Sequence, residues 1–481
     1  MISLNFGYVE GLPDYERKRL ERLKKIYDFH AISNWKKNRY YEGKVTLNDV
    51  NLGIALPSTI AKLQIGCSWG AKTVDVLAAR SMFDGFVDGN GADAVLINQI
   101  AKRNHLISEY MKNCREQLKY GGIYATVYGE KGNARIRFYS PNCAAASWDA
   151  EKGQIECGFA FDDGRYDESE LDWSPDSVNY YTEDAIWVLS REGGAWKAER
   201  YHHSFGKPLM IPLAWDATED KPFGQSRLKE PVRRLIEGYV RTVANATIGL
   251  EFATSPQKYL LGITDSQFDD LKDTKFVQYV GSILLGTVNP ETGQSPTYGQ
   301  LPQGNIQPHV EMMRMLATQF SAATGLTIAD TGVVNDANPT SSDAILAQSQ
   351  TLVLLAEQLN RGNGDALYEI GQMALAIELG TTPDNLPESE KNIIAHFKNP
   401  AMPSVAVTAD AAIKIASARE GFASTDIFLE MIGFDAADIR RIKSQEQRAA
   451  GQKILTEEFL NDTGRVEPVQ EPNVTSMQEG S

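Results

Sequence analysis

Residues 66–73 contain the residue types closest to a catalytic motif in this chain. Gly66-Cys67-Ser68-Trp69-Gly70 matches the G-x-S-x-G pattern that exposes a nucleophilic serine on a sharp strand-to-helix turn. Only 65 residues precede the motif, and they include no glycine-rich segment that could form an oxyanion hole. This context argues against a serine hydrolase.

The same segment is one residue short of a phosphate-binding loop. Ala71 stands where the pattern G-x-x-x-x-G-K-[ST] requires its second glycine, because a Cβ there obstructs the approach of backbone N–H groups to phosphate. Neither a convincing Walker-B strand nor a βαβ series follows. A nucleotide-dependent enzyme that uses Lys72 and Thr73 therefore stays only as the alternative function.

The histidines do not suggest a metal site. His202 and His203 are adjacent, so in a strand they point to opposite faces, and the other four histidines are scattered along the chain. No His, Cys or carboxylate spacing typical of zinc occurs. We expect no catalytic residue, no metal and no cofactor, and we expect that the chain is not an enzyme.

Residues 424–439 resemble a helix-turn-helix with Gly433 at the turn. The helix predicted at 436–455 has five basic and two acidic residues, which is a weak surplus for a recognition helix. Ordinary packing of short helices is favoured, and a structural scaffold with a DNA-binding C-terminus remains a further alternative.

Composition limits the possible classes of protein. The 481 residues include 48 Lys and Arg against 63 Asp and Glu, for a net charge of −15, and 42% are hydrophobic. These values exclude disorder of the whole chain, argue against tight sequence-specific nucleic-acid binding, and suggest two to four folding units. The four cysteines form no CxxC pair, so we expect reduced thiols. We also expect no signal peptide and no membrane span, hence a soluble protein that is intracellular at synthesis.

The charge is uneven along the chain. Residues 17–39 contain nine basic and two acidic side chains, a local charge of +7, so the remainder carries −22. Leu20, Leu23, Ile26 and Tyr27 follow helical spacing, which predicts an amphipathic helix with a basic outer face. That face is either simply solvated or in contact with DNA or an acidic partner.

The hydrophobic patterns predict a mainly helical α+β protein. Helices precede a strand-rich region at 134–215, an order that argues against a doubly wound parallel sheet. Helices at 226–254 and 308–325 bracket a compact β-like insert at 257–307, and a loop at 326–339 follows. Short helices are predicted at 409–419, 425–432 and 436–455, with a disordered tail after 461.

A long helix is predicted to begin near residue 341. Thr340 and Asp343 form a capping-box pattern, and a helical apolar stripe then continues to Ile377. About 38 residues would make a rod of nearly 60 Å. We expect this helix either to kink near Gly362-Asn363-Gly364 or to be shared across a subunit interface.

At this point the order of parts resembles the SPP1-type branch of the bacteriophage portal protein family, over nearly the whole chain. The similarity rests on the helix–insert–helix–loop–long-helix order and on these strings: Tyr40-Tyr41-Glu42-Gly43, Leu118–Val127, Phe223-Gly224-Gln225-Ser226, the apolar helix ending near Pro256, and Pro339–Ile345. The resemblance implies the following parts: a wing at 1–224 completed by the long helix 341–379, stem helices at 225–254 and 308–325, a clip at 255–307, a tunnel loop at 326–340, a crown at 380–460 and a disordered tail at 461–481.

The resemblance also implies a function. Such proteins form a ring, expected to be a dodecamer, at one capsid vertex, and double-stranded DNA passes non-specifically through the central channel during packaging and ejection. The implied partners are a terminase ATPase, an adaptor or head-completion protein, and the major capsid and scaffolding proteins, with no membrane. The protein would belong to the virion after assembly in the host cytoplasm.

Charge around the predicted tunnel loop fits weak contact with DNA. Residues 305–360 contain one basic side chain and five acidic ones, so a channel wall built from them would repel phosphate and let a duplex slide. The predicted channel-lining residues of the loop are Asp330, Thr331, Val333, Asn335, Asp336 and Asn338. Glu311 and Arg314 are the candidates on the second stem helix, where they could instead pair with each other.

Overall fold

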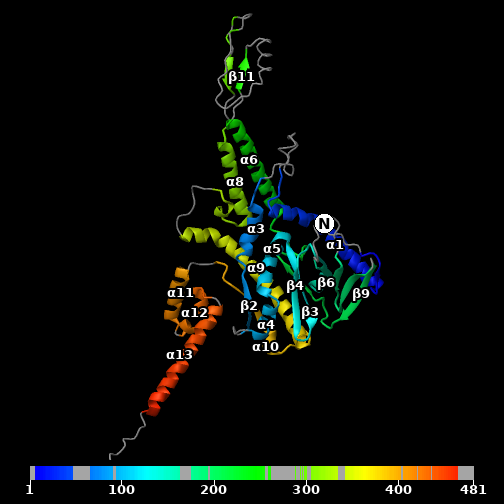
Figure 1. Ribbon diagram of the computed structural model, residues 1–481, viewed down its shortest axis with the longest axis vertical. Helices are drawn as coiled ribbons and strands as arrows, with labels where there is room; N and C mark the ends of the chain where they lie inside the picture. Colours follow the sequence, from blue (N-terminus) through cyan, green and yellow to red (C-terminus); the bar gives the residue numbers. More distant parts are fainter. Residues whose placement is uncertain are drawn as a thin grey trace, which may run out of the picture. The chain divides into compact units, whose positions relative to one another are not determined.

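The computed structural model shows an α+β protein in two compact units, Met1–Ala401 and Met402–Ser481 (Figure 1). This confirms the predicted fold class. The structure describes residues 6–46, 65–89, 94–162, 175–192, 195–254, 258–261, 297–300, 305–333, 342–401, 405–419, 421–434 and 436–463, together with the single positions 288, 293 and 295.

Two antiparallel sheets form the strand-rich region of the larger unit. The six-stranded sheet has the order β1-β9-β8-β7-β6-β5, and only its β1–β9 pair is parallel. Its strands are β1 Val9–Glu10, β5 Ala144–Asp149, β6 Gln154–Phe161, β7 Ser177–Tyr181, β8 Ala185–Glu192 and β9 Ala195–His202. The second sheet, β10-β3-β4, comprises β3 Gly122–Glu130, β4 Asn133–Tyr139 and β10 Met210–Ala214. The strands predicted in this region are confirmed, as is the absence of a doubly wound arrangement within it.

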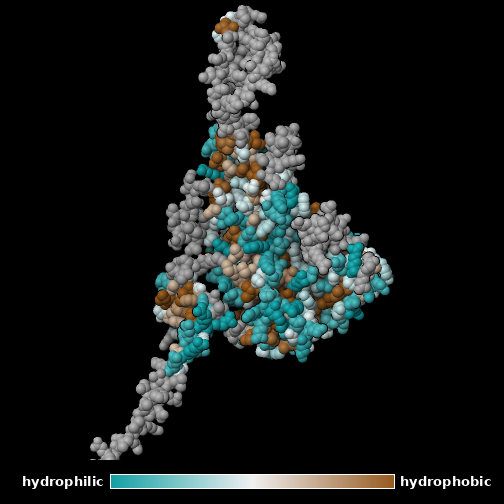
Figure 2. All heavy atoms as spheres, in the orientation of Figure 1, coloured by the Kyte–Doolittle hydropathy of each residue, from teal (hydrophilic) through white to brown (hydrophobic). Residues whose placement is uncertain are grey.

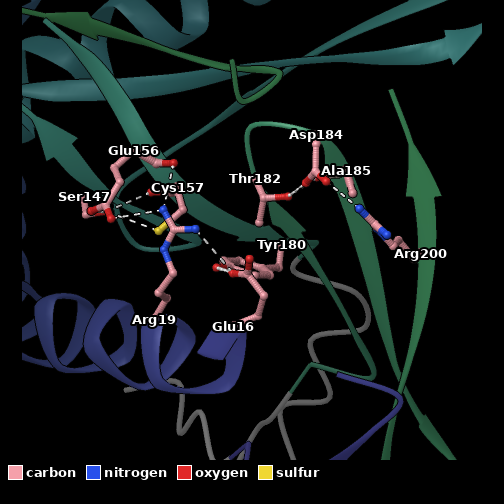
Figure 3. A network of polar contacts seen from close by, with 10 residues as sticks. All are labelled: Glu16, Arg19, Ser147, Glu156, Cys157, Tyr180, Thr182, Asp184, Ala185 and Arg200. Carbon is pink, nitrogen blue, oxygen red and sulfur yellow. Dashed lines mark hydrogen bonds and ion pairs between the residues drawn. The ribbon is translucent and has the colours of Figure 1, made fainter. Parts of the chain in front are cut away.

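Helix α1, Asp14–Tyr41, packs on the six-stranded sheet. Leu20, Leu23 and Tyr27 are buried against Phe159 and neighbouring apolar residues, as the predicted apolar face requires. The basic face is less uniform than the sequence suggests, because Arg19 turns inward. Figure 3 shows its guanidinium between α1 and β6, where Nη2 donates to Glu156 Oε1 at 3.0 Å.

Three helices form the other wall of the main core: α3 Trp69–Ala78, α4 Val95–Arg103 and α5 Leu106–Tyr120. Helix α9, Ser342–Leu379, packs against β3, β4 and β10, and its residues 373–377 are all buried. This 38-residue helix continues through residues 362–364, which include two of its three glycines. In this C-terminal part of α9, the apolar stripe is therefore buried within the larger unit.

A buried polar network ties α5 to α9. Asn363 Nδ2 donates to Tyr110 Oη at 2.7 Å and to Gln117 Oε1 at 2.9 Å, and Gln117 Nε2 donates back to Asn363 Oδ1 at 2.7 Å. Ser81 Oγ lies 2.6 Å from the same tyrosine oxygen. Asn363 thus serves as a buried hydrogen-bonding residue in the middle of the helix, where the sequence suggested a kink.

Helices α6, Glu230–Thr254, and α8, Gln307–Thr324, lie side by side (Figure 1). Pro231 occupies the first turn of α6, the one place where the helix tolerates it. Not every apolar residue of these helices is buried: Leu250 and Ala323 are exposed, whereas α6 buries Val232, Ile236, Val240 and Ala244. A strand pair, β11 Lys258–Leu261 with β12 Thr297–Gln300, confirms β structure between the helices, and most of the predicted clip lies outside the described residues.

The C-terminal boundary differs from the prediction that one module spans 380–460. Strand β13, Ile393–Phe397, pairs antiparallel with β2, Phe83–Asp88, so residues up to Ala401 belong to the larger unit. They include the short helices η3, Pro383–Asn385, and α10, Glu388–Lys391. Local periodicity cannot predict that these two strands pair, because they lie about 300 positions apart in the sequence.

The smaller unit contains α11 Val405–Ala418, η4 Phe422–Ser424, α12 Asp426–Ile432 and α13 Ala436–Thr463. Gly421 and Gly433 both have positive φ, which confirms the predicted breaks between the helices. Helix α13 runs past the predicted start of a disordered tail at 461, and residues 464–481 lie outside the described part. None of the described helices combines the length and apolar character needed to cross a membrane.

Candidate channel segment

The segment predicted to line a channel begins where α8 ends. Gly325 has φ of 73°, a left-handed conformation that suits glycine and turns the chain out of the helix. A 3-10 turn, η2 Ala329–Thr331, follows. The carboxylate of Asp330 accepts hydrogen bonds from the backbone N–H of Thr327 at 3.0 Å and from its hydroxyl at 2.8 Å. This loop therefore has a defined local structure as far as Val333.

An aromatic stack fixes the loop to the core. The indole ring of Trp69 lies between Tyr239 of α6 and Phe320 of α8, with ring centroids 4.2 and 4.5 Å away. Its Nε1 donates to the carbonyl oxygen of Thr331 at 3.0 Å. The buried Trp69 thus connects α3, both paired helices and the loop.

A buried arginine joins the same elements from the other side. Arg227 Nε donates to the carbonyl oxygen of Thr73 at 2.7 Å, and its Nη2 donates to that of Thr324 at 2.6 Å. Burial lowers the pKa of Arg227 to about 10. The guanidinium still carries a proton at neutral pH, so both carbonyl oxygens accept charge-assisted hydrogen bonds.

The structure separates the predicted channel residues into three groups. Asp330 and Val333 are partly exposed, and Val333 packs against the main core. Thr331 is only 7% exposed, and its hydroxyl donates to the carbonyl oxygen of Ile328, so in this conformation its side chain does not line a surface. Asn335, Asp336 and Asn338 lie outside the described residues.

Glu311 and Arg314 are both exposed on α8. Glu311 Oε1 accepts a hydrogen bond from Gln307 Nε2 at 3.4 Å, one turn earlier in the helix. Large apolar side chains also remain exposed on the paired helices, at Leu250, Met312 and Met315, and Figure 2 shows apolar atoms at this surface. The exposed face of the pair is therefore a mixture of apolar and charged groups.

The catalytic-looking string of residues 66–73 serves packing. Trp69 starts α3, so Gly70, Ala71 and Lys72 are helical and do not form a loop that could surround a phosphate. A Cβ on Gly70 would lie 2.0 Å from the carbonyl oxygen of Tyr40, which explains the glycine by a close approach to α1. Thr73 is buried and donates to the carbonyl oxygen of Trp69.

The two adjacent histidines have different surroundings: His202 is exposed and His203 is partly buried. His203 stacks edge-on against Phe205 at 5.8 Å, and burial lowers its pKa. Within the described ranges, no three His, Cys, Asp or Glu side chains come together as a possible metal site.

Two residues that matter most to this segment, Trp69 and Arg227, were not among the predicted site residues. Both had a local signal: Trp69 lies inside the G-x-S-x-G string, and Arg227 directly follows Phe223-Gly224-Gln225-Ser226. Neither signal shows the long-range partners, which are 262 and 97 residues away in the two hydrogen bonds described.

A family model described as "Phage portal protein, SPP1 Gp6-like" matches residues 19–452, nearly the whole chain. The protein therefore belongs to the phage portal protein family, as the sequence resemblance predicted. A comparison with curated proteins finds no match.

Solved structures that this chain resembles come from gene transfer agent (GTA) particles. They include the neck of a native GTA particle computed with C12 symmetry, at 12% identity, 76% coverage of this chain, 89% of that chain and a TM-score of 0.44. The virion of a native gene transfer agent particle has 13% identity, 76% coverage of this chain, 89% coverage of that chain and a TM-score of 0.43. The neck of an empty GTA particle computed with C6 symmetry has 13% identity, 77% coverage of this chain, 90% coverage of that chain and a TM-score of 0.45. Since these TM-scores are below 0.5, we draw no conclusion from the similarities.

Proposed function

We propose that this portal protein forms a closed ring, a dodecamer, at one capsid vertex, and that genome DNA passes through its central channel during packaging and ejection. The family match over residues 19–452 carries this proposal. The role is structural and non-enzymatic, with the driving ATPase chemistry in a separate terminase. The other proposed partners are an adaptor or head-completion protein and the major capsid and scaffolding proteins. The ring is assembled in the host cytoplasm and becomes part of the virion.

The proposed parts follow the elements of the fold. The wing would comprise the sheets, α1, α3 to α5, α9 and the segment up to Ala401. Helices α6 and α8 would be the stem, the insert between them the clip, and the unit from Met402 the crown. Exposed Leu250, Met312 and Met315 support a stem that packs against neighbouring copies, because burial of large apolar side chains stabilises an interface.

The loop after α8 is the proposed tunnel loop. Asp330 and Val333, with Asn335, Asp336 and Asn338 beyond the described residues, would face the DNA, and Glu311 and Arg314 would line the stem. One basic residue against five acidic ones between 305 and 360 supports weak, non-specific contact, since tight binding to DNA requires many Lys or Arg contacts to phosphate.

Imaging of the purified chain by electron microscopy tests this proposal. The expected result is a closed ring with a central opening and residues 326–333 on its inner wall. A chain that stays monomeric at all concentrations, or a ring with this segment on its outer surface, would overturn it. ATP binding that Lys72→Ala abolishes would instead favour the nucleotide-dependent alternative.

A further inference from the structure

A cavity of about 570 Å³ lies between α1, the start of α6 and the sheet that contains β3 and β10. Its walls combine apolar side chains, among them Phe29, Tyr124 and Phe223, with charged ones. Four basic residues and one acidic residue line it. The cavity is therefore cationic, in a chain whose overall charge is −15.

The basic groups of the cavity are only partly neutralised: Lys229 pairs with Asp216 at 2.5 Å, but Lys37 and Arg233 are less well matched. Lys37 Nζ donates to the carbonyl oxygen of Tyr120 at 3.0 Å, and no carboxylate among the described residues pairs with it. Arg233 is paired with Glu230, but the same carboxylate also pairs with Arg234. Burial, followed by the charge of Arg233, lowers the pKa of Lys37 to about 8. Two cations close enough to destabilise each other would gain from an anion between them.

Unused hydrogen-bond donors point to the same chemistry. Asn34 lines the cavity and is only 3% exposed, yet its Nδ2 has no partner within the described part of the chain. The Nε of Arg233 is likewise buried without a partner there. A buried donor without an acceptor costs about 1–3 kcal/mol. Both atoms are covered by their neighbours, so an acceptor oxygen entering the cavity would satisfy them once it displaced the covering atoms.

We infer that this cavity receives an acidic side chain on an apolar segment of a neighbouring copy of the same chain. Charge complementarity supports a second copy, because the residues outside 17–39 carry −22. The helix at the mouth also presents large apolar side chains to solvent: Phe29, Ile32 and Trp35 are 78%, 66% and 59% exposed. A carboxylate satisfies the donors, and the apolar flanks of its segment cover these side chains.

This inference rests on the proposed ring, in which copies lie side by side. Lys37→Glu should abolish the attraction, so that the protein concentration needed for half assembly rises at least about tenfold by mass photometry. Lys25→Glu is the matched control, because it makes the same charge change at an exposed position of α1 outside the cavity. Circular dichroism melting shows whether each variant is folded.

A crosslinking experiment identifies the occupant. A photoreactive benzoylphenylalanine at Phe29, in rings mixed from light and heavy-isotope chains, should give crosslinks between copies that map to a peptide containing Asp or Glu. Crosslinks confined to one chain, or rings of Lys37→Glu that form at the wild-type concentration, would refute the inference while leaving the ring intact. Wild-type chains that never form rings would refute the proposed function itself.

Discussion

Arg227 donates a hydrogen bond from Nη2 to the carbonyl oxygen of Thr324 at 2.6 Å, and this contact joins the segment before α6 to the last turn of α8. A second bond from Nε to the carbonyl oxygen of Thr73 adds α3 to the junction. One side chain thus donates to a backbone carbonyl in the middle of α3 and to another at the end of α8. The same junction holds the start of the proposed tunnel loop.

Arg227→Met should therefore destabilise the larger unit. It removes both charge-assisted hydrogen bonds and leaves the buried carbonyl oxygen of Thr324, at the end of α8, without this partner, so the free energy of unfolding should fall by roughly 2–4 kcal/mol. Urea denaturation measures the change. Arg135→Met, at an exposed position of β4, is the control and should stay within about 0.5 kcal/mol of wild type. Equal effects of the two substitutions would contradict a structural role for Arg227.

Gly70 and Gly66 offer a matched pair of substitutions within one motif. Gly70→Ala drives a methyl group against the carbonyl of Tyr40, at 2.0 Å from its oxygen, whereas a Cβ on Gly66 meets nothing within 4 Å. We expect Gly70→Ala to lower the free energy of unfolding by about 3 kcal/mol and Gly66→Ala to change it little. If both glycines instead mattered equally, the packing explanation of this string would fail. Thermal melting of the two variants provides the comparison.

Trp69 should control the order of residues 326–333 as well as stability. Trp69→Ala empties the space between Tyr239 and Phe320 and should cost roughly 3–5 kcal/mol. Trp69→Phe keeps most of the stack but loses the bond to the Thr331 carbonyl. Hydrogen exchange should then be faster in 326–333 while the strands of the six-stranded sheet are unchanged. Unaltered exchange in the loop would show that the indole N–H does not hold it.

The Asn363 and Gln117 pair should be strongly coupled. Asn363→Leu or Gln117→Leu alone leaves a buried amide without its partner, and each should lower the free energy of unfolding by roughly 2–3 kcal/mol. The double variant removes both polar groups, so its loss should be clearly smaller than the sum. A double-mutant cycle by urea denaturation measures this coupling, and simple additivity would contradict a direct interaction.

The lowered pKa of Lys37 predicts a specific pH dependence in the isolated chain. Its value of about 8 lies below the ordinary 10.5, so between these pH values the unfolded state binds more protons than the folded state. Stability of wild type relative to Lys37→Met should therefore rise with pH across this window. Urea midpoints of both proteins at pH 7 to 10, at a concentration below ring formation, measure the difference. A flat difference would mean that Lys37 has an ordinary pKa.

Local sequence patterns predicted much of the secondary structure. The helix predicted at 308–325 ends at Gly325 as expected, and the breaks between the C-terminal helices at Gly421 and Gly433 are confirmed. These features depend on residues close in sequence, such as a glycine that allows positive φ. The family resemblance was also readable from the order of these parts.

Other features depended on contacts between distant segments. The pairing of β13 with β2 moved the C-terminal boundary from 380 to after Ala401, and the packing of α6 selected Val232, Ile236 and Val240 for burial. Arg19 looked like part of a solvated basic face but bonds Glu156, 137 residues later. The spacing of apolar residues predicts which face of a helix is apolar, but it does not predict which other segment packs against that face.

The sequence by itself determined the fold class, the positions of most helices and strands, and membership in the phage portal family, because these follow from local propensity and the order of parts. Only the tertiary structure showed that Trp69, Gly70 and Thr73 pack a junction and that Lys37 and Arg233 share a cationic cavity. The reason is physical: burial, close approach and unsatisfied donors arise between segments far apart in the chain, and residue types alone do not specify which segments meet.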